Sequence, residues 1–253
     1  MRKFLISGLC FLLYCQHPAV ADEMPAVEGK PFALVELFGS EGCSSCPPAD
    51  DLLRELTAAA RTQGKNIFTL SFHVDYWDYL GWVDPFSSPQ FTRRQHAYAK
   101  ALKRSSVYTP QMIVNGTTQF VGSDRSLAEK YIEQNLQTPP ENQITVTLGA
   151  RAGPKAIEVL YHCREWMPNV LVHVALVEGG LQSQVTAGEN DGRILKHENV
   201  VRNFSTAPLA KKEGMFIMSK PMVDDLSRFS IIVYLQRTDD MKILAAESIG
   251  LSK

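Results

Sequence analysis

The chain has 253 residues, of which 45% are apolar and 21% are charged, a composition typical of a folded globular protein. Its net charge is −1 and it has no long basic run, which argues against a nucleic-acid partner because phosphate binding requires a concentrated basic face. Beyond the N-terminal region, no segment approaches the length of a membrane-spanning helix.

The first residues have the pattern of a secretory signal peptide. Arg2 and Lys3 supply positive charge, FLISGLCFLLYC supplies a short apolar run, and small residues at 19–21 favour cleavage before Asp22. We therefore expect residues 1–21 to be removed and the protein to be exported, either to the periplasm or out of the cell. The apolar run is too short for a membrane anchor, so we expect no membrane span after cleavage.

Cleavage would leave three of the five cysteines. Cys10 and Cys15 lie in the predicted signal peptide, whereas Cys43, Cys46 and Cys163 lie beyond it. Disulfides persist in exported compartments, and an odd number of cysteines leaves at least one thiol unpaired. Cys163 lies on the apolar face of a predicted strand, so we expect a buried structural thiol there.

The first elements alternate between strand and helix. Residues 31–38, PFALVELF, form a short apolar run that suits a strand buried on both faces. Residues 47–62 follow the cysteines and repeat their leucines at helical spacing, with prolines tolerated in the first turn. Residues 66–74, NIFTLSFHV, predict a second strand.

An aromatic loop, DYWDYLGWVDPF, occupies residues 75–86 and precedes a helix capped by Ser88. Residues 109–122 predict two strands joined by an Asn-Gly turn, which is a strong hairpin signal. Residues 124–136 predict a further helix. The order of this half is therefore strand, CxxC, helix, strand, helix, proline, two strands and helix.

The pattern changes after Thr138-Pro139-Pro140. Apolar residues now alternate along several predicted strands, in the sets Ile157/Val159/Tyr161/Cys163, Val170/Val172/Val174/Leu176 and Phe229/Ile231/Val233/Leu235. Strands of this kind with few helices favour an antiparallel sandwich or barrel. Residues 188–204 hold Arg193, His197 and Arg202, which would suit a docking surface or an anion site. The stretch is interpreted instead as a turn that leads into a strand, with no catalytic role.

Four stretches carry a resemblance to a known family: VELFGSEGCSSCPPAD, SFHVDYWDYLGWVDPFSSPQF, YTPQMIVNG and VGSDR. They resemble an uncharacterised family of secreted thioredoxin-like proteins, known as domain of unknown function 1223. The resemblance implies an α/β thioredoxin-like domain over residues 30–138. We expect a mainly antiparallel, sandwich-like β domain to follow over residues 141–253.

The cysteine pair is the main chemical feature. If Cys43 lies where a strand ends and a helix begins, unpaired amide groups and the helix dipole favour its thiolate, which is the nucleophilic form. Cys46, one turn further on, is placed to resolve a mixed disulfide. Asp50 and Asp51 oppose this effect, because their negative charges lie in the first turns of the same helix.

The resemblance to thioredoxins implies two further catalytic residues. Glu36 corresponds to an acidic residue that assists proton transfer at the resolving cysteine, although its spacing to the cysteines is one residue longer here. Pro110 corresponds to a cis proline beside Cys43, and Thr109 before it would pair with an extended substrate. From the residues alone, Glu36 is equally compatible with a strand edge or an ion pair, and Pro110 with an ordinary trans proline.

The aromatic loop is the predicted substrate-binding wall. Parallel strands bring their C-terminal ends to one edge of a sheet, where ligand sites gather. The four residues expected to line the cysteines there are His73, Asp75, Tyr76 and Trp77. The alternative is that the aromatic rings bury the loop against the second domain.

The leading hypothesis is an exported thiol–disulfide oxidoreductase that needs no cofactor. Its partners would be a protein or small-molecule thiol or disulfide substrate and a second redox partner. One alternative is a binding module in which Cys43–Cys46 is a permanent structural disulfide. Another is a copper-handling protein that uses Cys43, Cys46 and His73, although one CxxC and one histidine fall short of a closed four-ligand site.

Overall fold

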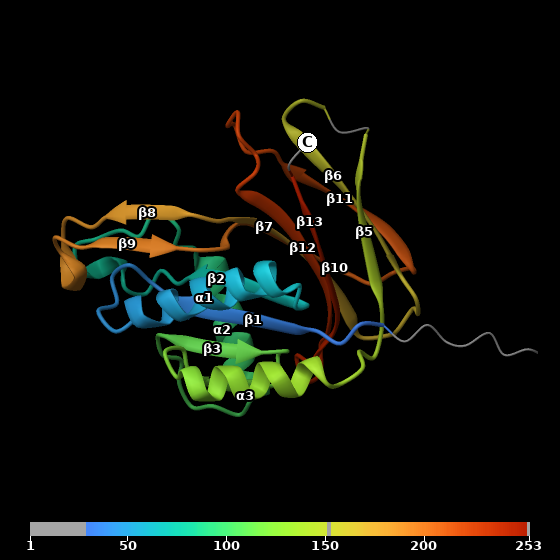
Figure 1. Cartoon of the computed structure of the whole chain (residues 1–253), viewed down its shortest axis with the longest axis horizontal. Helices are drawn as coiled ribbons and strands as arrows, with labels where there is room; N and C mark the ends of the chain where they lie inside the picture. The colour runs from blue at the N-terminus through green and yellow to red at the C-terminus, as the bar shows by residue number, and fades with distance from the viewer. Residues whose placement is uncertain (1–28, 151–152, 252–253) are drawn as a thin grey trace, which may run out of the picture.

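The computed structural model describes residues 29–150 and 153–251 (Figure 1). The predicted signal peptide of residues 1–21, with Cys10 and Cys15, lies outside the described residues, and export therefore stays a prediction. The elements of the described part, in chain order, are β1 (Ala33–Gly39), α1 (Pro47–Gln63), β2 (Ile67–His73), the 3-10 helix η1 (Asp78–Leu80), α2 (Pro89–Ala101), β3 (Gln111–Val114), β4 (Thr118–Val121), α3 (Arg125–Leu136), β5 (Ile144–Gly149), β6 (Ala156–Cys163), β7 (Val170–Glu178), β8 (Leu181–Gln184), the 3-10 helix η2 (Gly188–Asn190), β9 (Ile194–His197), β10 (Val200–Pro208), β11 (Glu213–Ser219), β12 (Phe229–Arg237) and β13 (Ile243–Gly250).

The individual elements predicted for the first half are confirmed. The Ser88 hydroxyl caps α2 by accepting a hydrogen bond from the Gln90 amide, and the Asp124 carboxylate caps α3 by accepting one from the Leu127 amide. Between β3 and β4, Gly116 has a φ of 76° and would overlap the Met241 carbonyl if it carried a Cβ. Local turn and cap signals thus locate these elements correctly.

The predicted fold class is wrong. The described chain is mostly β, and its largest sheet is a mixed eight-stranded one in the order β13-β12-β7-β10-β2-β1-β3-β4. It is not a thioredoxin-like α/β domain followed by a separate β sandwich. Strand β10 pairs in parallel with β2 through Val200 and Ser71, so strands from both halves of the chain form one continuous sheet. The domain division at residues 138–141 stays a prediction.

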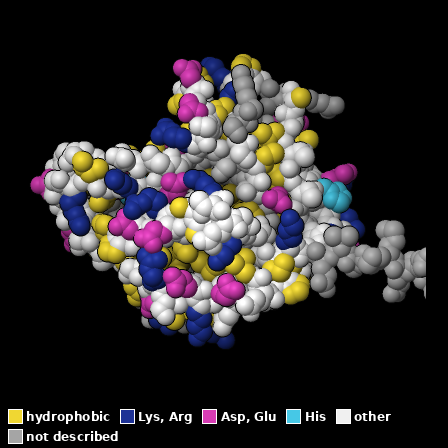
Figure 2. All heavy atoms as spheres, in the orientation of Figure 1, with side chains coloured by type: hydrophobic (Ala, Val, Ile, Leu, Met, Phe, Trp, Pro, Cys, Tyr) yellow, Lys and Arg dark blue, Asp and Glu magenta, His cyan; other side chains and the backbone are white. Residues whose placement is uncertain are grey.

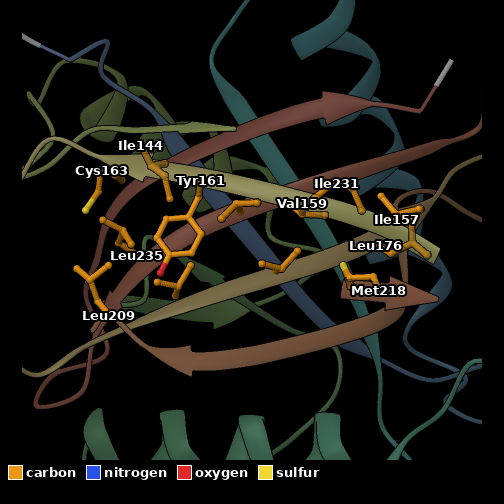
Figure 3. Close-up of a cluster of buried hydrophobic side chains, with 14 of the residues drawn as sticks. Ile144, Ile157, Val159, Tyr161, Cys163, Leu176, Leu209, Met218, Ile231 and Leu235 are labelled. Atoms are coloured by element: carbon orange, nitrogen blue, oxygen red, sulfur yellow. The ribbon is translucent and has the colours of Figure 1, made fainter. Parts of the chain in front are cut away.

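The eight-stranded sheet is buried on both faces. On one face, α2 packs over a cluster that extends from β1 and β2 to β7 and β12. On the other face, α1 and α3 cover β1 and β3. The three-stranded sheet β11-β6-β5 covers β7 and β12 on that same side (Figures 1 and 3).

The reason for the incorrect fold class is visible in β7 and β12. The three alternating sets predicted from the sequence do share one apolar cluster, with Cys163 among them as a buried free thiol (Figure 3). Burial raises the pKa of that thiol. The opposite faces of the same strands are also buried, through Ala175 and Val177 of β7 and Tyr234 of β12. Alternation along one strand indicates its faces but does not indicate which sheet the strand joins.

The surface matches the near-neutral composition. On the face shown in Figure 2, side chains of both charges are interspersed. Among the described residues, no helix has the length and apolar character needed to cross a membrane.

Candidate functional site: a covered Cys43–Cys46 disulfide

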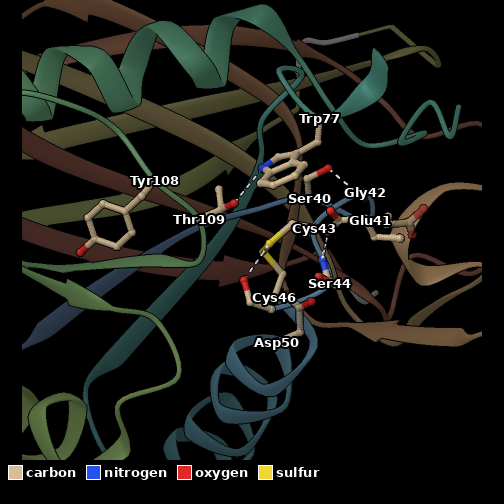
Figure 4. Close-up of a disulfide and its surroundings, with 12 residues drawn as sticks. Ser40, Glu41, Gly42, Cys43, Ser44, Cys46, Asp50, Trp77, Tyr108 and Thr109 are labelled. Carbon is tan, nitrogen blue, oxygen red and sulfur yellow. Dashed lines mark hydrogen bonds between the residues drawn. A yellow bond between two sulfur atoms is a disulfide. The ribbon is translucent and has the colours of Figure 1, made fainter. Parts of the chain in front are cut away.

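The cysteine pair lies where β1 ends and α1 begins. Cys43 and Cys46 form a disulfide with their Cα atoms 5.5 Å apart (Figure 4). Strand β1 is central in the sheet, between β2 and β3, so the site stands on a rigid base. The loop that carries the cysteines passes close to Trp77, and Gly42 permits this because it has no Cβ. A Cβ built on Gly42 would lie 3.0 Å from the Trp77 Cβ.

The start of α1 differs from the sequence expectation. Cys46 is the N-cap of the helix, so both cysteines precede its first turn. Pro47 and Pro48 have no amide hydrogen, and the Ala49 and Asp50 amides both donate to the Cys46 carbonyl. The helix therefore offers few unpaired amide groups to a thiolate, and the dipole remains as its main contribution.

Both cysteines are buried. The exposed fraction is 0% for Cys43 and 1% for Cys46, although Ser44 and Ser45 between them are exposed. The Asn190 side-chain amide donates to the carbonyls of Glu41 (2.8 Å) and Cys43 (3.0 Å). Next to it, the Glu189 carboxylate accepts a hydrogen bond from the Ser44 amide at 3.0 Å. Two residues far along the chain thus hold the cysteine loop.

A buried group of charges adjoins the cysteine loop. His197 Nε2 lies 3.0 Å from the Glu41 carboxylate, and its Nδ1 lies 3.7 Å from the Asp50 carboxylate. Burial alone lowers the pKa of His197, but the nearby carboxylates of Asp50 and Glu41 outweigh burial and raise the pKa to about 10. The imidazole is therefore a cation at neutral pH, and it balances one of the two carboxylates.

A second histidine lies beside the first. The His73 and His197 rings meet edge to face with their centroids 4.9 Å apart, and His73 Nδ1 lies 2.6 Å from the Asp84 carboxylate. Burial raises the pKa of Asp84, yet His73 and the amides of Glu41 and Phe86 together lower it to about 2. The Asp84 carboxylate also accepts from the Glu41 amide at 2.8 Å, which fixes the chain just before the cysteines.

The aromatic loop meets the site through Trp77. Its indole N–H donates to the Thr109 hydroxyl at 2.8 Å, and Trp77 and Thr109 lie on one side of the disulfide with Asp50 on the other (Figure 4). Tyr76 donates instead to Gln95 of α2, and burial raises its pKa to about 12. Asp75 accepts a hydrogen bond from the Thr92 hydroxyl. Of these three predicted substrate-binding residues, Trp77 thus makes the short hydrogen bond to Thr109.

The peptide bond between Thr109 and Pro110 is cis, as the family resemblance implied. Pro110 is buried beside the start of α1, since a Cβ built on Gly122 would lie 3.0 Å from the Pro110 Cβ and 3.2 Å from the Ala49 Cβ. Thr109 and Pro110 therefore belong to the surroundings of the cysteine pair.

Glu36 lies elsewhere. It shares the face of β1 that packs under α2, whereas Leu37 points to the opposite face with α1. Its carboxylate accepts from Arg94 Nε at 2.7 Å and from the Tyr98 hydroxyl. The structure therefore does not bring Glu36 to Cys46, and the carboxylates that adjoin the cysteine loop are Glu41 and Asp50.

Sequence reasoning missed Asn190, His197 and Glu41. Glu41 stands only two residues before Cys43, a position close enough to have suggested a role. Asn190 and His197 lie in the stretch interpreted as a simple turn, and no local pattern links them to the cysteines. Among the described residues, no group of three or more His, Cys, Asp and Glu side chains is arranged to hold a metal ion. His73 is engaged with Asp84, so no observation favours the copper-handling alternative.

The fold and the site together define a predominantly β protein whose main sheet presents a CxxC disulfide at the end of a central strand. Residues 34–236 match the family described as "Protein of unknown function (DUF1223)", and the chain belongs to that family.

One solved structure resembles nearly the whole chain. The X-ray structure of a protein from Agrobacterium tumefaciens is 27% identical, with a TM-score of 0.64, and the match covers 87% of this chain and 95% of that one. A domain of the outer membrane lipoprotein Omp28 from Porphyromonas gingivalis is 11% identical, with a TM-score of 0.27, over 45% of this chain and 89% of that one. A β-glucuronidase from Ruminococcus gnavus is 14% identical, with a TM-score of 0.27, over 46% of this chain and 16% of that one. No curated protein matches the chain.

Proposed function

We propose that the protein is an exported thiol–disulfide oxidoreductase whose reactive pair is Cys43 and Cys46. The observation that carries the proposal is the disulfide between two cysteines three residues apart, held at the N-terminus of a helix on a central strand. A short CxxC loop of this kind closes and opens with little rearrangement of the chain. The pattern of residues 1–21 supports export, and exported compartments are where such a pair finds disulfide substrates.

The exchange proceeds in two steps. A substrate thiolate attacks one sulfur of the Cys43–Cys46 disulfide, which forms a mixed disulfide and releases the other cysteine as a thiolate that takes up a proton. A second substrate thiolate then attacks the mixed disulfide, so the substrate gains a disulfide and the pair is left as two thiols. Two electrons pass from substrate to protein. The reverse sequence reduces a substrate, and a second thiol–disulfide couple resets the pair.

The surroundings give each neighbour a part in this chemistry. Thr109 is half-buried beside Pro110, and in this proposal its backbone pairs with an extended substrate. Trp77 holds Thr109 through its indole N–H. The His197 cation offsets the Glu41 and Asp50 carboxylates, which would otherwise disfavour a cysteine thiolate.

The test is an equilibrium reduction potential together with an exchange assay. We expect the pair to be reduced and reoxidised in thiol–disulfide buffers at a potential above about −300 mV, the range of exchangeable disulfides. We also expect the protein to reduce or oxidise a peptide disulfide, and Cys43→Ser to abolish this. If wild type and variant both leave the peptide unchanged across several buffers, the oxidoreductase is excluded.

A second candidate is favoured by the burial of both cysteines. A covered disulfide is typical of a structural bond, and here it would hold residues 41–46 in place for a binding module that uses the aromatic loop. The same measurement separates the two functions, because a structural bond would have a potential below about −300 mV.

A further inference from the structure

The segment that holds the cysteine loop forms an arm of its own. This arm, residues 181–197, comprises β8, η2 and β9, and its two strands pair with each other in a separate two-stranded sheet. Figure 1 shows it extending from β7 and β10 alongside α1. The backbone is left-handed at both ends of the arm, with φ 68° at Gly180 and 47° at Asn199. These two positions are suited to act as hinges, since hinges are a few element-terminal residues.

The arm lies outside the main apolar core. All of its residues are described, and none of them belongs to the three apolar clusters of the protein. Between the arm and α1 lies a crevice of about 340 Å³, whose lining includes the charged residues Asp50, Asp51, Arg54, Arg193 and Lys196. Separation of the arm would expose the buried side chains of Val185 and Leu195, but neither belongs to an apolar cluster, so opening is less costly than the unfolding of a core element.

The contacts of the arm converge on the cysteine loop. Asn190 occupies the carbonyls of Glu41 and Cys43, and Glu189 occupies the amide of Ser44. At the end of β9, His197 lies against Glu41 and Asp50. Two backbone acceptors and one backbone donor of the loop are thus satisfied by the arm, and an extended polypeptide offers the same complement of groups.

We propose that the arm is a removable cover that occupies the place of a polypeptide substrate at the Cys43–Cys46 disulfide, with Asn190 and His197 as positioning residues that hold it closed. This inference rests on the proposed exchange function and names its substrate class, an extended peptide segment with a thiol or a disulfide. In the closed form the sulfurs are out of reach. Opening uncovers them together with the loop carbonyls and the Ser44 amide, which the substrate backbone then engages.

The first test measures how fast the disulfide is reduced by excess dithiothreitol in Asn190→Ala, Glu189→Ala and wild type. Asn190→Ala removes two hydrogen bonds that close the arm, so we expect reduction to accelerate on the order of ten-fold; Glu189→Ala should give a smaller gain. Gln184→Ala, an exposed residue of the same arm, is the matched control and should keep the wild-type rate. Hydrogen exchange at the Ser44 amide should quicken in the same order.

Equal reduction rates in all four proteins would overturn the inference, as would a wild-type rate equal to that of an unfolded CSSC peptide. The Glu189 variant keeps the test valid if Asn190→Ala fails to fold, because Glu189 is exposed. The equilibrium potential, measured on the same samples, judges the exchange function separately from the arm. A reduction potential in the range of structural disulfides, together with clearly different reduction rates among the variants, would reject the exchange function but support the arm as a cover of the disulfide.

A second test addresses the substrate class. A Cys46→Ser protein is joined through Cys43 to a linear peptide that has one cysteine and no lysine or arginine. We expect trypsin to cleave after Arg193 and Lys196 of the arm several-fold faster in this conjugate than in the conjugate with 2-mercaptoethanol, because the longer peptide displaces the arm. Equal cleavage rates in the two conjugates would show that a bound peptide does not displace the arm, and would reject an extended peptide as the substrate. Failure to form either conjugate would count against the exchange function.

Discussion

Two buried groups of charges on either side of β1 behave in opposite ways. Glu36 and Arg94 meet under α2, inside an apolar cluster, with both side chains less than 10% exposed. Glu41 and His197 meet beside the disulfide, and the histidine belongs to an arm outside every cluster. Both pairs balance a carboxylate with a cation. They differ in whether the cation can lose its proton and whether its element can leave.

The Arg94 pair is a permanent link. The guanidinium lies within 5.0 to 5.6 Å of the centroids of four aromatic rings, those of Phe72, Tyr98, Phe204 and Tyr234. It also donates to Gln236 of β12, so an α2 residue ties β1 to the C-terminal half. An arginine stays charged in a protein at any ordinary pH. The His197 pair, by contrast, holds a segment that can separate, through a cation that can be neutralised.

The largest expected effect comes from breaking the permanent pair. Arg94→Met fills similar space but leaves the Glu36 carboxylate buried without a cation, so we expect the free energy of unfolding to fall by about 3–5 kcal/mol. Urea unfolding measures it. Arg93→Met is the matched control, because Arg93 is the exposed neighbour on the same helix and should change stability by under about 0.5 kcal/mol. A loss as small as that of the control would show that the pair contributes nothing to the link.

The separable pair should respond to pH. The folded-state pKa of His197, about 10, lies above its ordinary value of 6.5, so its stabilisation is complete below pH 6.5 and is lost as the pH rises towards 10. At pH 6 we expect the free energy of unfolding of the wild type to be about 2 kcal/mol higher than that of His197→Gln. This difference should disappear near pH 10. His162→Gln, at an exposed position, supplies the control. A gap that persists unchanged at pH 10 would contradict the charge assignment of His197.

The contrast also explains what the sequence could predict. Caps, prolines and the Asn-Gly turn are local signals, and they located α1, α2, α3 and the β3–β4 hairpin correctly. The disulfide, too, lies between residues three apart. The partners of the Arg94 pair and of the arm are distant in the chain: Arg94 is 142 residues from Gln236, and Asn190 is 147 residues from Cys43. Such contacts depend on how strands are ordered in a sheet, which local periodicity does not encode.

Glu36 illustrates the same limit. An acidic residue in an apolar strand signals a special role, but the sequence does not say which face of the sheet it takes or what it meets there. A shift of one position along a strand reverses the face, and Glu36 lies opposite the side that contacts α1. Glu41, in the loop before Cys43, is one of the two carboxylates that adjoin the cysteine loop, with Asp50.

The assignment of these two carboxylates can be sharpened through the reduction potential of the cysteine pair. Glu41→Gln removes a negative charge near the cysteines, which favours their thiolates and the reduced form, so we expect the potential to rise by about 30 mV, equivalent to about 1.4 kcal/mol. Glu36→Gln, on the other face of the sheet, is the matched comparison and should shift it by under about 10 mV. A larger shift from Glu36→Gln than from Glu41→Gln would return the proton-transfer role to Glu36.

The smallest expected effect concerns the link between the aromatic loop and the Thr109 edge. Trp77→Phe keeps a ring beside Gly42 but removes the indole donor to Thr109, and Thr109→Val removes the acceptor. A double-mutant cycle of the two changes in urea unfolding should give a coupling energy of about 1 kcal/mol, the net value of one hydrogen bond. Because this link joins the aromatic loop to the sheet and not to the arm, the same coupling should be found in an Asn190→Ala background. A coupling that vanishes there would mean that the arm, rather than the sheet, holds Trp77 in place, and the division between fixed and separable parts of the site would have to be redrawn.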